Sequence, residues 1–322
     1  MTARRHHYLP RCYLKGFAKA RKQGKSHHVH VFDRDGKAFT ANIINVAAEK
    51  DFNRIEVEGH APDAFEQGIA KFEGELAPAL VRILERQSLG DDDDRVLLMN
   101  LIGLAAIRNP RHRESIRSFH QRTADIIVDL ATSTKERWEG QMRQMKAAGY
   151  APKHDVSYEE MRRAVSEKAF RLEVSTERHI ELEMHSLEAV LRTLLDRKWV
   201  VLLAPKETGG FITCDHPVCL MFSDPKKRGG FRPVGHGLMG TEVIFPVSRR
   251  MAVVGAFELQ EDTVTLSDDW VAWINGALVA YANRQVYAAD PRFTYSRQNN
   301  EKPRMGVSLV KDALFLKKSQ RK

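Results

Sequence analysis

The pattern of apolar and polar positions divides the chain into strand-rich ends and a helical middle. A continuous apolar run, WVVLLA, begins at Trp199 and is typical of a strand buried on both faces. A Gly-Gly pair then indicates a turn, and the following FITC is rich in aromatic and β-branched residues. We therefore predict two paired strands, the second of which ends at Asp215 and His216.

Before this pair, the N-terminal residues predict a short helix and a hairpin. Apolar and aromatic positions between Pro10 and Lys19 share one face of a helix. The alternating stretch 28–33 predicts a strand, and the Asp-Gly pair that follows it is a strong hairpin signal. The return strand is predicted over 39–45.

Helical spacing of apolar residues predicts the middle of the chain. A helix from Pro62 to Leu84 should break or kink at Pro78. After four aspartates, an apolar stretch that ends at Arg108 predicts the buried central helix. Further helices are predicted over 113–148, 157–173, which opens with a capping box at Ser157, and 175–198.

The residues after Pro217 predict strands, one helix and a basic loop. The loop runs from Ser223 to Gly240, and strands are predicted over 242–248 and 251–257. Pro246 makes the first of these an edge strand or a bulge. We also predict a helix over 268–282, a short strand after it, a weakly ordered basic tail over 290–322 and one further strand at 306–310.

Strands and helices are segregated along the chain, which favours an α+β fold in one compact unit. We expect an N-terminal β-hairpin, a central helical block and a C-terminal antiparallel sheet with one packed helix. The expected boundaries are 1–60, 61–198, 199–289 and 290–322.

Composition places the protein among ordinary globular chains, with 43% hydrophobic and 29% charged residues in 322. We expect no membrane association, because no apolar run approaches the length of a membrane span and no apolar stretch follows the basic start. Three cysteines form no disulfide framework and suit a reducing cytoplasm.

The net charge of +9 is concentrated at the two ends. Residues 1–28 carry eight Lys or Arg and no acid, and residues 302–322 carry a net +6; subtracting both leaves −5 for residues 29–301. Basic ends suit a polyanion such as RNA or DNA. Solubilising termini explain the same charge equally well.

Several enzyme classes are disfavoured by missing motifs. The sequence contains no GxxxxGK[ST] phosphate loop, no GxGxxG after a strand and no GxSxG elbow. NTPase, Rossmann dehydrogenase and α/β-hydrolase interpretations therefore lose support.

Three segments together resemble a known family. HYLPRCYLKGF at 7–17, the Arg-x-Pro at 108–110 and FITCDHP at 211–217 are similar to motifs of the DUF4238 family of uncharacterised bacterial proteins. Cys214 and His216 stand where the family pattern has Ser and Asn. The resemblance runs from His7 to about Tyr287 and implies an architecture and candidate residues rather than an activity.

Four polar residues at element ends are the candidate catalytic set: His7, Arg108, Asp215 and Arg284. A histidine acts as general acid or base near neutral pH, an arginine clamps phosphate, and an aspartate orients the histidine or binds a metal. The alternative is a buried ionic network that ties the N-terminal segment to the helical core. Candidate substrate contacts are Tyr13, Thr213, His216, Lys227 and Arg228.

A metal site is a weaker prediction. His179 and Glu183 are four residues apart on one helical face, but a solvated ion pair is the commoner outcome of this spacing. A divalent metal would suit the predicted chemistry, and no motif requires one.

These features support three hypotheses. The first is a nuclease or phosphodiesterase that uses acid–base chemistry with arginine clamping of phosphate. The second is a nucleic-acid-binding or interaction module without catalysis. The third is a nucleotide sensor whose Ser223–Gly240 loop closes over its ligand. The sequence predicts neither the oligomeric state nor the particular substrate.

Overall fold

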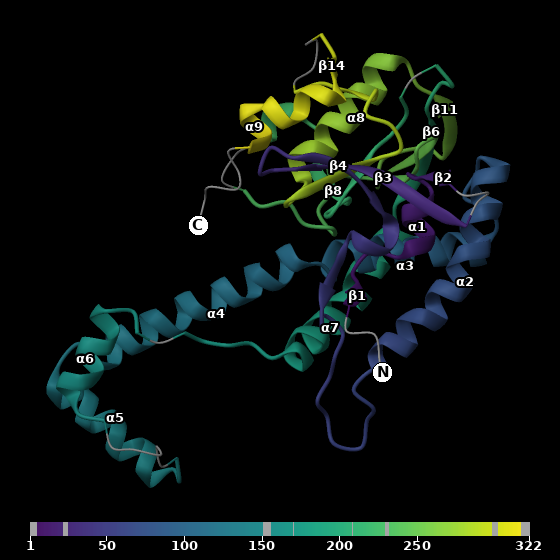
Figure 1. Ribbon diagram of the computed structural model, residues 1–322. Coiled ribbons are helices and arrows are strands. Elements are labelled where there is room, and N and C mark those ends of the chain that lie inside the picture. The colour runs from purple at the N-terminus through teal and green to yellow at the C-terminus, as the bar shows by residue number, and fades with distance from the viewer. Residues whose placement is uncertain are drawn as a thin grey trace. The chain divides into compact units, whose positions relative to one another are not determined.

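The computed structural model describes residues 5–21, 25–150, 156–169, 171–207, 209–228, 232–297 and 302–316 (Figure 1). The expected α+β class is confirmed by its mixture of helices and mainly antiparallel sheets. The expectation of one compact unit was wrong, because the chain forms two. The smaller unit is Pro110–Ser175, and the larger one combines Met1–Asn109 with Thr176–Lys322.

The smaller unit contains three helices, α4 (Pro110–Ala131), α5 (Lys135–Ala147) and α6 (Tyr158–Ser166). The single helix predicted over 113–148 was wrong, because Thr134 caps a new helix by accepting a hydrogen bond from the N–H of Arg137. The predicted capping box between Ser157 and Glu160 is confirmed. The helix after it is shorter than predicted.

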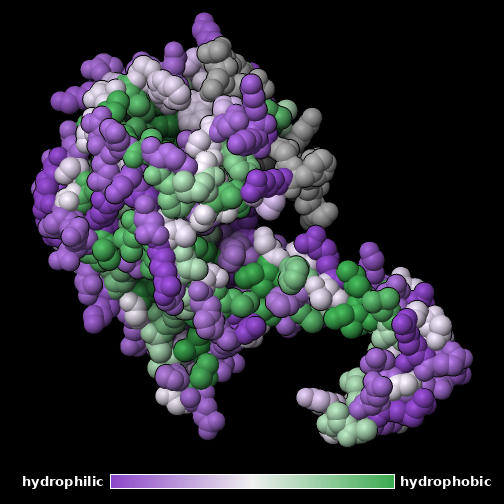
Figure 2. All heavy atoms as spheres, turned by 180° about the vertical axis from the view of Figure 1, so that it is seen from behind, coloured by the Kyte–Doolittle hydropathy of each residue, from purple (hydrophilic) through white to green (hydrophobic). Residues whose placement is uncertain are grey.

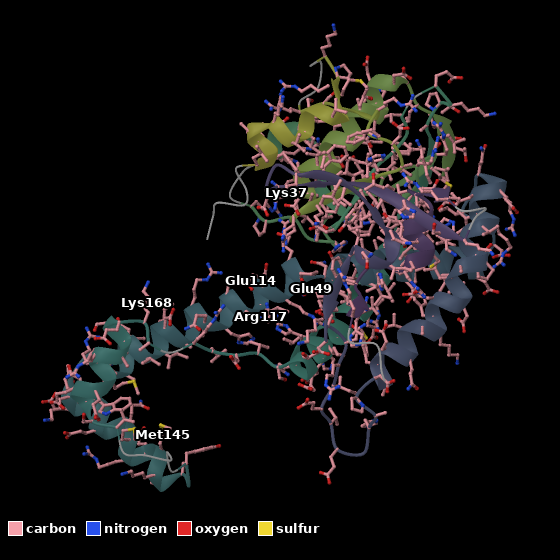
Figure 3. The ribbon with its side chains drawn as sticks, in the orientation of Figure 1. Lys37, Glu49, Glu114, Arg117, Met145 and Lys168 are labelled. Atoms are coloured by element: carbon pink, nitrogen blue, oxygen red, sulfur yellow. The ribbon has the colours of Figure 1, made fainter. Side chains whose placement is uncertain are left out.

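Helix α4 exposes a row of apolar side chains (Figure 2). Phe119, Ile126, Ile127 and Leu130 are each more than half exposed. On the same helix, Glu114 and Arg117 form an ion pair of 3.1 Å (Figure 3). No residue of α5 or α6 is buried among those that the structure describes, so this unit has little core of its own.

The helical layer of the larger unit consists of α2 (Ala64–Arg86), α3 (Asp92–Ile107) and α7 (Thr176–Leu195), with α3 in contact with both others. The buried central helix is confirmed, and Asp91 caps it by accepting from the N–H of Asp94 at 3.0 Å. Of the two effects predicted for Pro78, the break was wrong, because α2 runs through this residue and buries Leu76 and Leu80 on either side; the kink stays a prediction. Within the described ranges, no helix is long and apolar enough to span a membrane.

The larger unit also contains two five-stranded sheets. In the first, with order β11-β6-β10-β9-β8, all pairs are antiparallel except β11 with β6. The second has order β2-β3-β12-β7, with β4 paired to β3. The first sheet comprises β6 (Lys198–Leu203), β8 (Cys219–Phe222), β9 (Thr241–Ser248), β10 (Met251–Ala256) and β11 (Asp262–Thr265). The second comprises β2 (Lys19–Arg21), β3 (Ser26–Asp33), β4 (Ala38–Asn42), β7 (Thr213–Cys214) and β12 (Gln285–Ala288).

The pairing of the strands after Trp199 was predicted wrongly. Strand β6 lies in the first sheet and β7 lies in the second, so the chain changes sheets between them. Gly210 makes this change possible, because its φ is +81° and a Cβ there would lie 2.2 Å from the carbonyl oxygen of Arg249. The predicted N-terminal hairpin, in contrast, is confirmed as β3 and β4.

Two other strand predictions need correction. Pro246 lies in β9, between β10 and β8, so the edge position was wrong. The bulge alternative is confirmed, because the β9–β10 register shifts between Met251 and Ala252, opposite Ser248 and Pro246. The strand predicted at 306–310 is a 3₁₀ helix, η3 (Gly306–Lys311).

The C-terminal residues that the structure describes are ordered rather than a loose tail. Strand β13 (Thr294–Tyr295) pairs with β14 (Arg304–Met305), and η3 is followed by α9 (Ala313–Leu316). Leu309 and Phe315 are buried. The prediction of weak order was therefore wrong for 302–316, and its last six residues lie outside the described ranges.

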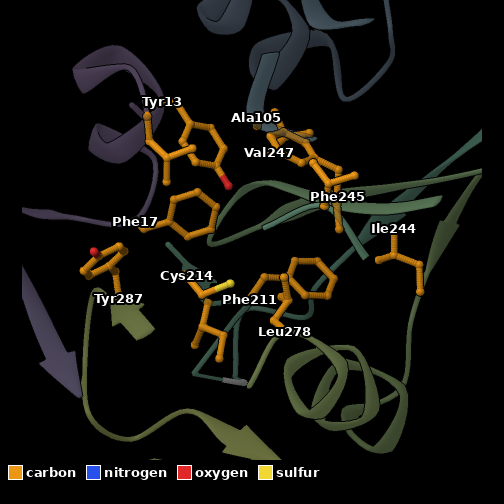
Figure 4. Packing of buried hydrophobic residues seen from close by; sticks show 14 of the residues in the cluster. Tyr13, Phe17, Ala105, Phe211, Cys214, Ile244, Phe245, Val247, Leu278 and Tyr287 are labelled. Carbon is orange, nitrogen blue, oxygen red and sulfur yellow. The ribbon is translucent and has the colours of Figure 1, made fainter. Parts of the chain in front are cut away.

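The core packs α1 (Arg11–Lys15), a shorter helix than predicted, against β9, while α8 (Asp268–Tyr281) packs on β7 and β8 (Figure 4). The ring of Tyr13 stacks on Phe245 at 5.2 Å between centroids. Its hydroxyl lies 2.7 Å from Oγ1 of Thr213. This buried pair joins α1 to β7 of the second sheet, two residues before Asp215.

Candidate functional site

The guanidinium of Arg108 anchors the N-terminal segment to the end of α3. This buried group donates from Nη2 to the carbonyl of His7 at 2.8 Å and from Nη1 to that of Tyr8 at 3.2 Å. Nη2 also donates to Oδ1 of Asn53 at 3.2 Å, and the ring of Phe52 lies 5.7 Å away. These contacts support the buried network that we set against catalysis.

The two imidazoles of β1 (Arg5–His7), which pairs with β5 (Ala48–Lys50), contact nearby main chain. Nε2 of His7 lies 3.3 Å from the carbonyl oxygen of Ile43, and burial lowers the pKa of His7. In His6, Nδ1 accepts a hydrogen bond of 2.9 Å from the N–H of Asn53. A neutral His7 that donates from Nε2 would keep Nδ1 as its basic atom.

The carboxylate of Asp215 closes the turn between α8 and β12. It accepts hydrogen bonds from the N–H groups of Asn283 at 2.7 Å, Arg284 at 2.6 Å and Gln285 at 3.0 Å. Burial raises the pKa of Asp215 to about 6, and the three donors act in the opposite direction. The carboxylate therefore caps main-chain N–H groups of a turn that is distant in sequence.

The four candidate catalytic residues therefore meet in two pairs. Arg108 binds the main chain of His7, and Asp215 binds the main chain of Arg284. Each pair joins segments that are distant in sequence. Catalysis by the four stays a prediction.

The metal candidates lie inside the helical layer. His179 and Glu183 are both buried on α7, one turn apart. Across the described ranges, no group of three or more His, Cys, Asp or Glu is arranged to hold a metal ion.

A cavity of about 460 Å³ lies against β8 and α8. Its walls come from β8, the basic loop after it, the exposed stripe of α8 and the residues that follow β13. This volume lies in the range of small-molecule sites. The lining side chains that carry the argument below are Lys227, Arg228, Arg232, Arg297, Trp273 and Tyr281.

Four cations line this cavity, and two of them are held by carboxylates. Arg228 pairs with Glu242 at 2.8 Å, donates to the carbonyl of Phe222 at 2.7 Å and lies 5.4 Å from the ring centroid of Trp273. Arg297 binds Asp312. The positive side of the cavity is thus partly preorganised.

The other two cations, Lys227 and Arg232, are exposed on the basic loop. Among the residues that the structure describes, neither forms a hydrogen bond or ion pair with a carboxylate, and no lining residue is acidic. Both charges are therefore available to an anionic ligand.

The aromatic side of the cavity comes from α8. Trp273 is half-buried, and the hydroxyl of Tyr281 donates to the carbonyl of Leu220. The ring of His216 lies nearly parallel to that of Tyr281, with the centroids 6.1 Å apart. His216 therefore packs against a ring that lines the cavity without lining it itself. Lys227 and Arg228 are lining residues, whereas Tyr13 and Thr213 form the buried pair in the core.

Sequence reasoning missed Trp273, Tyr281, Arg232 and Arg297 as site residues. The aromatic pair was visible as the apolar face of the 268–282 helix, and Arg232 as part of the basic loop. What the sequence lacked was a signal that this loop lies against this helix.

Fold and cavity together define the class: an α+β protein with a cation-rich, aromatic pocket between one helix and a basic loop. The family model described as a protein of unknown function, DUF4238, matches residues 5–292, and the chain belongs to this family. Searches of curated proteins and of solved structures gave no significant match.

Proposed function

We propose that this protein binds a nucleotide, either free or as a unit of a nucleic acid, in the cavity between α8 and the basic loop. The observation that carries the proposal is the lining itself, in which four cations share one cavity of about 460 Å³ with the rings of Trp273 and Tyr281. Lys and Arg bind phosphate, and aromatic side chains stack on bases.

We expect binding to require both the cations and the aromatic rings of the cavity. A phosphate would take the positions near Lys227 and Arg232, whose charges no acidic lining side chain offsets among the described residues. The base would lie against Trp273 or Tyr281, where apolar contact replaces water. A nucleoside alone would contact only the aromatic rings, and inorganic phosphate alone would contact only the cations.

Calorimetric titration of the full-length protein tests the proposal. Nucleoside monophosphates should bind more tightly than the matching nucleosides and more tightly than inorganic phosphate. Lys227→Ala and Arg232→Ala should each weaken nucleotide binding about tenfold, the usual effect of losing one charge-assisted contact.

The matched control is Lys71→Ala, which removes one exposed cation from α2, away from the cavity. It should leave the affinity unchanged. Failure of every nucleotide to bind, or equal loss in Lys71→Ala and Lys227→Ala, would contradict the proposal.

Phosphodiester cleavage and a requirement for basic termini stay predictions. The contacts of His7, Arg108 and Asp215 join main-chain segments, which is why we place binding before catalysis. Incubating the purified protein with RNA and DNA would show whether it also cuts them.

We also infer a cytoplasmic location. Cys12, Cys214 and Cys219 are free thiols, and the latter two are buried. Unpaired cysteines suit a reducing compartment.

A further inference from the structure

One large aromatic side chain lies just outside the cavity. Trp270 is 54% exposed at the start of α8, although tryptophan is usually among the more buried residues. Its ring centroid lies 5.7 Å from that of Trp273, which lines the cavity. The two indoles therefore form one continuous aromatic surface that leads from solvent into the pocket.

The helical spacing places Trp270 in line with the cavity wall. Trp270, Trp273, Ala277 and Tyr281 are separated by three, four and four residues, so they share one face of α8. The last three of these line the cavity. Asp268 lies two residues before Trp270 and faces another side of the helix, whereas Asp269 lies four residues before Trp273 and stands on the same side as these rings.

The geometry of the two indoles suits two bases rather than one. Their planes are inclined at 73°, so a single planar base cannot stack on both rings. The ring centroids are 5.7 Å apart, so two neighbouring bases that are splayed from each other, as in an unstacked single strand, could each lie on one ring.

We propose that the ligand is a single-stranded nucleic acid, with one nucleotide in the cavity and its neighbour stacked on Trp270. This inference rests on the proposed function, because the first nucleotide uses the cavity described above. Lys227 and Arg232 would bind the phosphates, and the two indoles would act as the stacking platform found in single-strand binders.

Comparing a mononucleotide with short oligonucleotides tests the inference separately from the cavity. Calorimetry on the full-length protein would use one nucleoside monophosphate and eight-nucleotide single strands of RNA and of DNA. The oligonucleotide should bind more tightly than the mononucleotide. Trp270→Ala should weaken oligonucleotide binding about 5- to 100-fold, the range for losing one stacked base, and leave mononucleotide binding unchanged.

Two further variants complete the experiment. Trp270→Phe keeps an aromatic face and should retain most of the oligonucleotide affinity. Phe39→Ala removes another exposed aromatic ring, on β4, and should have no effect. Tighter binding of one of the two oligonucleotides would show whether the protein prefers single-stranded RNA or single-stranded DNA.

The outcomes separate the two proposals. Normal mononucleotide binding with equal oligonucleotide affinity in Trp270→Ala and the unmodified protein would overturn this inference alone. Absence of binding to both ligands would overturn the proposed function as well. A duplex that binds better than either single strand would also contradict the inference.

Discussion

Two opposite effects act on the pKa of Asp215. Its carboxylate is buried, which raises its pKa to about 6, yet it accepts three main-chain hydrogen bonds that favour the charged form. A carboxyl group in the unfolded chain titrates near 3.8. Between these values the unfolded chain releases its proton first, so the free energy of unfolding should fall as the pH rises.

The variant Asp215→Asn tests this predicted pH dependence of stability, because the amide does not titrate. The free energy of unfolding of the unmodified protein, minus that of the variant, should decrease by roughly 3 kcal/mol between pH 3.5 and 6.5. Urea unfolding followed by circular dichroism at several pH values would measure it. A difference that increases with pH would mean that the three N–H donors lower the pKa of Asp215 below that of the unfolded chain.

At the scale of elements, the approach of α8 to β13 depends on a missing side chain. A Cβ on Gly276 would lie 1.7 Å from the carbonyl oxygen of Ser296, which is main chain and has little freedom to move. The N–H of Ser296 donates to the carbonyl of Ala272 at 2.9 Å, which fixes the same contact from the other side. The helix that bears the aromatic wall is thus positioned by its backbone.

Gly276→Ala should therefore lower the free energy of unfolding by about 1–3 kcal/mol, the usual effect of overpacking. The matched control is Gly68→Ala on α2, where a Cβ would meet nothing within 4 Å. That variant should be neutral or more stable by up to about 1 kcal/mol, because alanine favours the helix. Denaturant titration of both variants would decide, and equal effects would contradict the packing argument.

The hydrophobic pattern of the sequence predicted individual helices and strands better than it predicted which of them lie side by side. The β3–β4 hairpin, the buried α3 and the capping box of α6 all depend on residues close in sequence. Strand β6 was recognised correctly, but its apolar run carries no information on which strand lies beside it. The wrong pairing with β7 followed from assuming that neighbours in sequence pair in space.

At the scale of the whole molecule, the two units differ in how much they bury. Strands β9 and β10 are almost entirely buried, whereas α5 and α6 contain no buried residue among those described. Amides in α5 and α6 should exchange with deuterium at least tenfold faster than those of β9 and β10, because local opening there breaks few contacts. Native-state exchange followed by mass spectrometry would measure this. Equal protection would contradict the argument that low burial makes these helices open more easily.

The candidate site was only partly predictable, because sequence patterns describe single elements and not the contacts between them. Lys227 and Arg228 were named from the composition of their loop, whereas Trp273 and Tyr281 were assigned to an apolar helix face. Both assignments describe single elements correctly. The cavity exists only where the loop and the helix meet, and residue types do not specify that meeting.

The sequence by itself determined the α+β class, the family and most of the elements, because hydrophobic period, caps and turn residues act over a few positions. The tertiary structure alone decided which strands share a sheet and what Asp215 contacts. Its three donors lie 68 to 70 residues further along the chain. Contacts at this separation depend on how complete elements pack, and no local pattern encodes them.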